Sequence, residues 1–208
     1  SCSDDVKTKS SVAFSDKDYS EAFQLIEYWL DAQKDYENLP GLTAMVGNEN
    51  GAVWTGAFGM ANENDIMNIE NTFSICSISK LFTSVAIMKL VEEGKIKLED
   101  PINKLLPWFD LNQQFKGSPP LTIKSILSHS SGLPRESNHP YWSWPDFPFP
   151  SKEDVVKELK NQEMLYPSSQ YYQYSNLGLS LLGYVVEEVS VKLNCSIKTL
   201  SFTCRRLL

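Results

Sequence analysis

A serine and a lysine stand three positions apart in the segment FSICSISKLF, residues 73–82. Residues at this spacing on a helix lie on one face, so Ser77 and Lys80 would be neighbours. A neutral lysine amine beside a serine hydroxyl can accept the hydroxyl proton and make the oxygen a nucleophile. The alternative is an ordinary helix start, in which Ser77 caps the helix and the Lys80 side chain extends to solvent.

A second group with suitable chemistry occurs in the segment YYQYSNLG, residues 171–178. Tyr174 and Asn176 stand on either side of a serine, directly before an apolar run. A phenol can act as a base or a proton shuttle, and a carboxamide can hold a substrate amide. The same spacing recurs at Tyr36 and Asn38, which we interpret as a helix end. The position of Tyr174 before a second apolar helix favours it as the functional copy.

Helices are expected to position both groups. Apolar residues nearly all round predict a centrally buried helix from Ser77 to Gly94, and a second apolar helix runs from about 176 to 189. Thr122 is expected to cap a short helix and Ser151 to begin a surface helix. The loop at 134–150, rich in proline and aromatic residues, either lines an acyl pocket or packs the lobe.

The N-terminal part changes from helical to strand-like periodicity. Residues 15–36 have the spacing of an amphipathic helix. Two short runs at 42–47 and 52–59 flank Asn50 and Gly51, a strong hairpin signal because both residues tolerate positive φ. A helix followed by a hairpin predicts an antiparallel sheet with a helix on its face.

Composition and missing motifs exclude several classes of function. Hydrophobic residues make up 42% of the 208 and the net charge is -7, as in a globular protein without a nucleic-acid partner. The sequence has no C-x-x-C, no glycine-rich phosphate loop and no G-x-S-x-G. We therefore expect no metal and no cofactor.

Four segments together resemble the serine β-lactamase and penicillin-binding protein superfamily, in its branch of class C β-lactamases, D,D-carboxypeptidases and esterases. They are PGLTAMVGNENGAVWTGAFGMAN, TFSICSISKLFTSVAIMKLVEEGKIKLEDPI, LTIKSILSHSSGLP and YSNLGLSLLGYVVEEVS. The resemblance covers roughly residues 20–190. It implies an α/β fold of the α+β type, β-lactamase/transpeptidase-like, with an antiparallel sheet, helices and an all-helical lobe.

The resemblance also implies roles for individual residues. Ser77 becomes the acylated nucleophile and Lys80 its proton acceptor. Tyr174 becomes the general base or acid, and Asn176 a contact to the substrate amide. His129 falls in an H-x-S-G-L stretch, where we interpret it as a packing residue at a helix end.

The sequence departs from the family at its C-terminal end. The third motif of the family, K-T-G or H-x-G, does not occur, because none of the ten glycines has Lys, His or Arg two positions before it. We therefore expect a truncated domain over 18–190, with a helical lobe over about 85–190 and the C-terminal sheet strands missing. Residues 191–208 contain four basic and no acidic side chains. Our hypothesis for them is an atypical, out-of-frame tail, and the alternative is a genuine short variant.

These features predict a serine hydrolase that forms an acyl-enzyme on Ser77. Its substrate would be a β-lactam, a D-Ala-D-Ala peptide or other peptidoglycan-like molecule, or a small ester. The alternatives are a penicillin-binding or sensing module that turns over poorly, and a catalytically dead fragment. Because the strand that carries the third motif is not in the sequence, we expect low activity of this chain.

The first residues suggest where in the cell the protein is located. Residues 1–17 have the composition of a flexible polar tether, and Cys2 followed by SDD is typical of a bacterial lipoprotein after removal of its signal peptide. We expect a monomer in the bacterial cell envelope, in the periplasm, with Cys2 as a lipid anchor and as its only link to a membrane. The alternative is a disordered terminus with an incidental cysteine.

Overall fold

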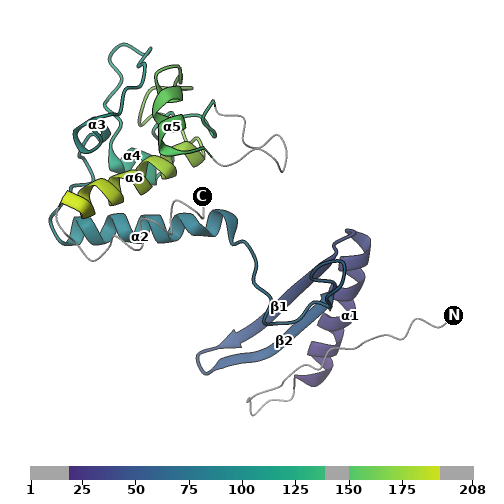
Figure 1. Ribbon diagram of the computed structural model, residues 1–208. Helices are drawn as coiled ribbons and strands as arrows, with labels where there is room; N and C mark the ends of the chain where they lie inside the picture. Colours follow the sequence, from purple (N-terminus) through teal and green to yellow (C-terminus); the bar gives the residue numbers. More distant parts are fainter. Residues whose placement is uncertain (1–18, 139–149, 193–208) are drawn as a thin grey trace. The chain divides into compact units, whose positions relative to one another are not determined.

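The structure is a computed structural model that describes residues 19–138 and 150–192. Cys2, most of the aromatic loop (residues 139–149) and the tail beyond residue 192 lie outside the described residues. The chain divides into two compact units, Ser1–Phe73 and Ser74–Leu208. Each unit is described by itself (Figure 1).

The first unit contains one helix and one hairpin. Helix α1 spans Ser20–Tyr36, and strands β1 (Gly41–Asn48) and β2 (Gly51–Gly59) pair as a two-stranded antiparallel sheet. The register pairs Gly41 with Gly59 and Asn48 with Gly51, with an irregularity after Val46. The predicted hairpin is confirmed.

One face of α1 packs against β2 around a single buried tryptophan. The exposed fraction of Trp54 is 1%, and its Nε1 donates to Glu27 Oε1 at 3.0 Å. The ring of Phe23 stacks on Trp54 with a centroid distance of 6.0 Å. Because a buried indole N–H needs a partner, the glutamate on α1 fixes this face of the helix toward the sheet. The predicted packing of a helix on the hairpin is confirmed.

Helices alone make up the regular structure of the second unit, within its described residues. A 3₁₀ turn, η1 (Cys76–Ile78), leads directly into α2 (Ser79–Glu92). The short helices are α3 (Ile102–Leu105), α4 (Ile123–Leu127) and α5 (Lys152–Leu159). The last helix is α6 (Asn176–Lys192).

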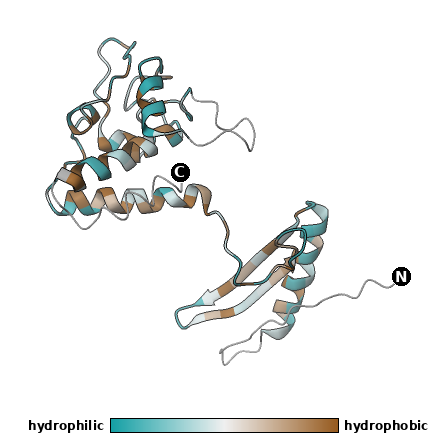
Figure 2. Ribbon diagram, viewed as in Figure 1, coloured by the Kyte–Doolittle hydropathy of each residue, from teal (hydrophilic) through white to brown (hydrophobic). Residues whose placement is uncertain are grey.

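The core of the second unit surrounds α6. Leu181, Leu182 and Val185 are fully buried, and Ile87 and Leu90 of α2 contribute to the same cluster. Figure 2 shows hydrophobic residues along both helices. The strongly apolar character of α6 is therefore explained by burial on most of its sides.

The predicted starts of α4 and α5 are confirmed in detail. Thr122 Oγ1 accepts from Ser125 N and Ser151 Oγ from Asp154 N, and in both boxes the N3 side chain accepts from the cap residue's N–H. Each box satisfies two N–H groups that a helix start leaves without partners. The two short helices therefore begin where the sequence indicated.

Helix α2 differs from its prediction on one side. Thr83, Ala86 and Ile87 are buried, whereas Leu81 and Val85 are 65% and 66% exposed. Within the second unit α2 packs chiefly on α6, and one neighbouring helix can cover only one face of another. The expectation of burial on all sides is met on that face alone.

The boundary between the two units falls between Phe73 and Ser74, so that α2 belongs to the same unit as the later helices. The domain over 18–190 with a helical lobe from about residue 85 stays a prediction. Within residues 19–138 and 150–192, no helix combines the length and the apolar character needed to cross a membrane.

Candidate active site

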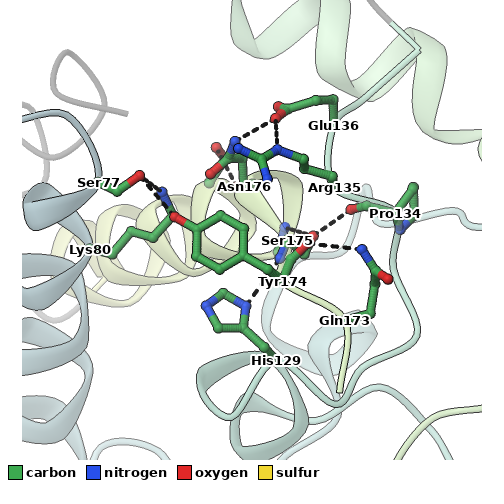
Figure 3. Close-up of polar contacts among 12 residues, drawn as sticks. Ser77, Lys80, His129, Pro134, Arg135, Glu136, Gln173, Tyr174, Ser175 and Asn176 are labelled. Atoms are coloured by element: carbon green, nitrogen blue, oxygen red, sulfur yellow. Dashed lines mark hydrogen bonds and ion pairs between the residues drawn. The ribbon is translucent and has the colours of Figure 1, made fainter. Parts of the chain in front are cut away.

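Ser77 lies in the 3₁₀ turn that precedes α2 and accepts two side-chain hydrogen bonds. Lys80 Nζ donates to Ser77 Oγ at 3.1 Å, and Tyr174 Oη donates to the same oxygen at 2.8 Å (Figure 3). Ser77 and Tyr174 are 97 positions apart in the sequence. The fold of the second unit therefore brings one serine oxygen within hydrogen-bond reach of two groups that can exchange protons.

The backbone around η1 turns Ser77 outward. Cys76 has φ 43°, in the left-handed region that non-glycine residues enter at a cost. Ser77 is exposed, whereas Ser79, two residues later, is fully buried. This local conformation separates a serine that faces solvent from one that faces the core, and Lys80 follows one helical turn after Ser77 on the same side.

Two cations lie over the ring of Tyr174. Lys80 Nζ is 5.0 Å from the ring centroid and the guanidinium carbon of Arg135 is 5.3 Å from it. Partial burial raises the pKa of Tyr174, but hydrogen bonds with Lys80 and Ser77 and the charges of Lys80 and Arg135 outweigh it. The net effect is a pKa below the usual value of a phenol, so that the Tyr174 hydroxyl beside Ser77 loses its proton more easily than an ordinary phenol.

Tyr174 and Asn176 are held by the residue between them. Ser175 Oγ accepts from Gly178 N at 2.9 Å, as the cap of an α-helix does, and donates to Pro134 O at 2.7 Å. Ser175 is 1% exposed. This buried serine anchors the start of α6, so that the residues on its two sides keep fixed positions.

Asn176 contacts a charged pair that the sequence analysis did not single out. Its Nδ2 donates to Glu136 Oε1, and the same carboxylate oxygen lies 3.3 Å from Arg135 Nε (Figure 3). A carboxylate only accepts hydrogen bonds, so Glu136 requires the NH₂ side of the Asn176 amide to face it. Asn176 Oδ1 then lies on the other side, buried and without a hydrogen-bond partner among the described residues.

His129 lies on the opposite side of the same turn. Its Nδ1 accepts from Ser175 N at 3.1 Å, and its ring is 4.6 Å from the ring of Tyr174. Burial, and to a lesser degree the charge of Lys80, lower the pKa of the imidazole below its usual value. The interpretation as a packing residue at a helix end agrees with its place after α4, although its contacts reach the candidate site itself.

Gly132 allows the loop after His129 to pack closely against the segment around Tyr166. Gly132 has φ 81°, and a Cβ at this position would collide with the carbonyl oxygen of Tyr166. Its own carbonyl oxygen accepts from Leu165 N at 2.8 Å. This glycine therefore lets the loop that carries Arg135 and Glu136 pack against the segment before Tyr174.

The structure brings four of the five predicted site residues into one place. Ser77, Lys80 and Tyr174 share hydrogen bonds, and Asn176 begins the helix that follows Tyr174. Cys2, the predicted lipid anchor, lies outside the described residues. Within residues 19–138 and 150–192, no group of His, Cys, Asp and Glu side chains could hold a metal ion.

Sequence reasoning missed Arg135 and Glu136. They follow directly after the segment LTIKSILSHSSGLP, in which only Thr122 and His129 were interpreted. A pair of opposite charges next to a segment that resembles the family was the available signal.

The fold and site together define a class. A serine in the turn before a helix, with a lysine and a phenol within hydrogen-bond reach of its oxygen, is the arrangement expected of a protein that works through a serine nucleophile.

Comparison with known proteins identifies the family. The model of the family described as Beta-lactamase matches residues 27–195. The protein "Beta-lactamase-like protein str5" of Strobilurus tenacellus is 30% identical, and the match covers 86% of this chain and 75% of that protein. The chain belongs to the β-lactamase family, a family of hydrolases.

Two further similarities support the same placement. "Beta-lactamase-like protein 2" of Dictyostelium discoideum is 33% identical over 63% of this chain. The structure of the octameric penicillin-binding protein homologue from Pyrococcus abyssi superposes with a TM-score of 0.71 at 26% identity, over 87% of this chain. The predicted resemblance and the predicted β-lactamase/transpeptidase-like fold are confirmed. The chain spans 25% of the length of the Dictyostelium protein and 41% of the Pyrococcus chain.

Proposed function

We propose that the protein is a serine hydrolase that forms an acyl-enzyme on Ser77 Oγ. The observation that carries this proposal is the pair of hydrogen bonds, from Lys80 and from Tyr174, that meet at this one oxygen. A serine that only capped a helix would need neither, since a cap bonds to backbone N–H groups. Membership in a family of hydrolases supports the same reaction class.

In the first step, Ser77 Oγ attacks the carbonyl carbon of the substrate and its proton moves to a neighbouring base. We propose as that base the Tyr174 phenolate, formed when the hydroxyl that donates to Ser77 Oγ has lost its own proton; the lowered pKa makes this loss easier, and Lys80 is the cation that stabilises the phenolate. The tetrahedral intermediate then collapses, and the leaving amine or alcohol takes the proton from the Tyr174 hydroxyl. Lys80 as the direct proton acceptor is the alternative route.

In the second step, water attacks the acyl-enzyme. Tyr174, again deprotonated after the first product leaves, accepts a proton from the water, and the returned proton restores Ser77. The same two side chains therefore serve both halves of the reaction, as expected for a ping-pong hydrolase.

The proposed substrate is a carbonyl compound with an amide or ester bond: a β-lactam, a D-Ala-D-Ala peptide or a small ester. Asn176 supports substrates with an amide near the reacting carbonyl. Glu136 orients its carboxamide and leaves Oδ1 as an acceptor without a partner in the described residues. A substrate N–H that reached this oxygen would satisfy it, although the oxygen is buried and the approach requires a small local rearrangement.

The test is covalent labelling with a fluorophosphonate probe, together with turnover of a chromogenic cephalosporin, a fluorescent penicillin and a short-chain ester. Ser77→Ala should abolish labelling and turnover. Ser74→Ala, an exposed serine three positions earlier, is the matched control and should leave both unchanged. Stable labelling of the parent protein without turnover would indicate a penicillin-binding module instead. No labelling of the parent protein by any probe would contradict the proposal.

A further inference from the structure

His129 holds the turn that carries Tyr174 and Asn176 at two points. Its carbonyl oxygen accepts from Gln173 N at 2.6 Å, and its Nδ1 accepts from Ser175 N at 3.1 Å (Figure 3). Gln173 and Ser175 are the residues directly before and after Tyr174. The backbone on both sides of Tyr174 is therefore hydrogen-bonded to His129.

The backbone conformation of His129 makes this double contact possible. Its φ is 55°, in the left-handed region, directly after the end of α4. A residue other than glycine adopts this conformation at a cost, and histidine is among the residues found there more often than most. The conformation directs both the carbonyl oxygen and the ring toward the same neighbouring turn, and the two hydrogen bonds offset its cost.

The imidazole ring also restrains the phenol ring. The centroids of the His129 and Tyr174 rings are 4.6 Å apart with an interplanar angle of 35°, and Tyr172 contacts the imidazole edge-on at 5.8 Å. Lys80 and Arg135 lie over the Tyr174 ring. The ring whose hydroxyl donates to Ser77 is thus held by an imidazole and two cations.

Only the neutral imidazole can accept the hydrogen bond from Ser175 N. A protonated ring carries N–H at both nitrogens, so Nδ1 would face the Ser175 N–H with a hydrogen of its own. The charge would also join those of Lys80 and Arg135 around one phenol, with Tyr172 and Tyr174 as the other titratable groups in contact. Burial and Lys80 lower the pKa of His129, in agreement with a neutral ring near pH 7.

We propose that His129 is a positioning residue, whose neutral imidazole holds Tyr174 in hydrogen-bond reach of Ser77. The proposal rests on the proposed function, since Tyr174 is taken as the acid–base group. Protonation of His129 removes the bond from Ser175 N, one of the two that hold the turn, and weakens the contact between Tyr174 and Ser77. The protein then loses acylation rate on the acid side for a second reason, beyond the protonation of Tyr174 itself.

Two variants separate the hydrogen bond from the ring. His129→Asn provides an acceptor near the position of Nδ1, tolerates a left-handed backbone and does not titrate. His129→Phe keeps an aromatic ring and removes the acceptor. The rate of fluorophosphonate labelling of Ser77 is measured for the full chain and both variants, from neutral pH to well below the usual histidine pKa of about 6.5.

Because the pKa of His129 is lowered, the fall of the labelling rate in the parent protein should become steeper only at a pH below the usual histidine pKa of about 6.5. His129→Asn should keep most of the rate at neutral pH and lose the added steepness. His129→Phe should lose about tenfold at neutral pH, the size of one hydrogen bond, and should approach the rate of the parent protein where His129 is protonated. Parent-like rates in His129→Phe at neutral pH, or the same profile in the parent and His129→Asn, would overturn the proposal.

A second measurement does not depend on activity. The amide proton of Ser175, followed by NMR in the parent protein, should shift with the titration of His129, because its acceptor is lost. A Ser175 shift that stays constant through this titration would overturn the proposal even where labelling is intact. Failure of the proposed function is seen differently, as no labelling of the parent protein at any pH.

Discussion

Two segments of this chain share the pattern Y-x-N, and only one of them is surrounded by reactive groups. Tyr36 is the last residue of α1 and is 78% exposed. Asn38 follows with φ 53°, and its N–H donates to Asp35 O. This first copy is a helix end that uses asparagine for its tolerance of a left-handed backbone.

The second copy begins a helix instead of ending one. Tyr174 is partly buried and hydrogen-bonded to Ser77, and Asn176 is hydrogen-bonded to Glu136. The residue between them, Ser175, is nearly fully buried and caps α6. The comparison shows that the tripeptide itself carries no function, since the neighbouring elements decide what the phenol and the carboxamide contact.

The largest expected difference between the two Y-x-N copies is the loss of turnover when the tyrosine hydroxyl is removed. Tyr174→Phe removes the hydroxyl that donates to Ser77 and keeps the ring, so turnover should fall about 100- to 10,000-fold, the usual value of a general acid–base group. Turnover of the ester and the cephalosporin measures this. Thermal unfolding of the variant should stay close to that of the parent protein.

Tyr36→Phe is the matched control, with the same chemical change in the other copy. It should leave turnover and labelling unchanged, because the Tyr36 hydroxyl lies at an exposed helix end. Equal effects of the two substitutions would show that the distinction between the copies is wrong.

The second expected difference is in the carboxamide. Asn176→Ala should reduce turnover of amide-bearing cephalosporins about 10- to 100-fold, since a hydrogen bond to a buried polar group is lost. A simple ester without an amide should be affected much less, and kcat/KM for both substrates measures the difference. Asn38→Gly, which keeps the left-handed backbone accessible, should change neither. An equal loss for ester and cephalosporin would limit Asn176 to a structural role.

Many elements of the fold could be predicted from the sequence, whereas the contacts at the candidate site could not. Hydrophobic periodicity, the two capping boxes and the Asn50-Gly51 turn are local signals, and the corresponding elements formed as expected. The contact between Ser77 and Tyr174 joins residues 97 positions apart, which no local pattern encodes. Only the resemblance to a family linked them before the structure did.

Three residues whose contacts at the candidate site the sequence did not reveal act across loops. Arg135, Glu136 and His129 lie in a short stretch between α4 and α5 and contact a turn about 40 positions later. Their roles depend on the left-handed conformations of His129 and Gly132, which a spacing rule does not predict. The exposed face of α2 could not be predicted either, because apolar composition does not show which faces of a helix are covered by neighbouring elements.

A smaller effect is expected from the carboxylate behind Asn176. Glu136→Gln removes the charge that orients the amide and leaves a side chain that can accept or donate. Turnover of the cephalosporin should fall about tenfold or less, the size of one charge-assisted hydrogen bond. Glu37→Gln makes the same chemical change in the other Y-x-N copy. It is the control and should leave turnover of the cephalosporin unchanged. A larger loss than in Asn176→Ala would show that Glu136 acts on something other than this amide.

The smallest expected effect is a displacement of the pH profile by Arg135→Ala. The charge of Arg135 is one of the causes that lower the pKa of Tyr174, so its removal should raise that pKa. A smaller fraction of Tyr174 is then deprotonated at neutral pH, and the rise of the acylation rate moves to higher pH. The rate at high pH should approach that of the parent protein. A profile that moves to lower pH, or does not move, would contradict Tyr174 as the base.

The most direct test of the account is the position of the acyl group. The protein is incubated with a penicillin, its intact mass is measured, and the modified peptide is fragmented to locate the adduct. We predict a single adduct with the full mass of the penicillin on Ser77, and none on the neighbouring Ser74 or Ser79. An adduct on any other residue, or one that persists in Ser77→Ala, would contradict Ser77 as the nucleophile.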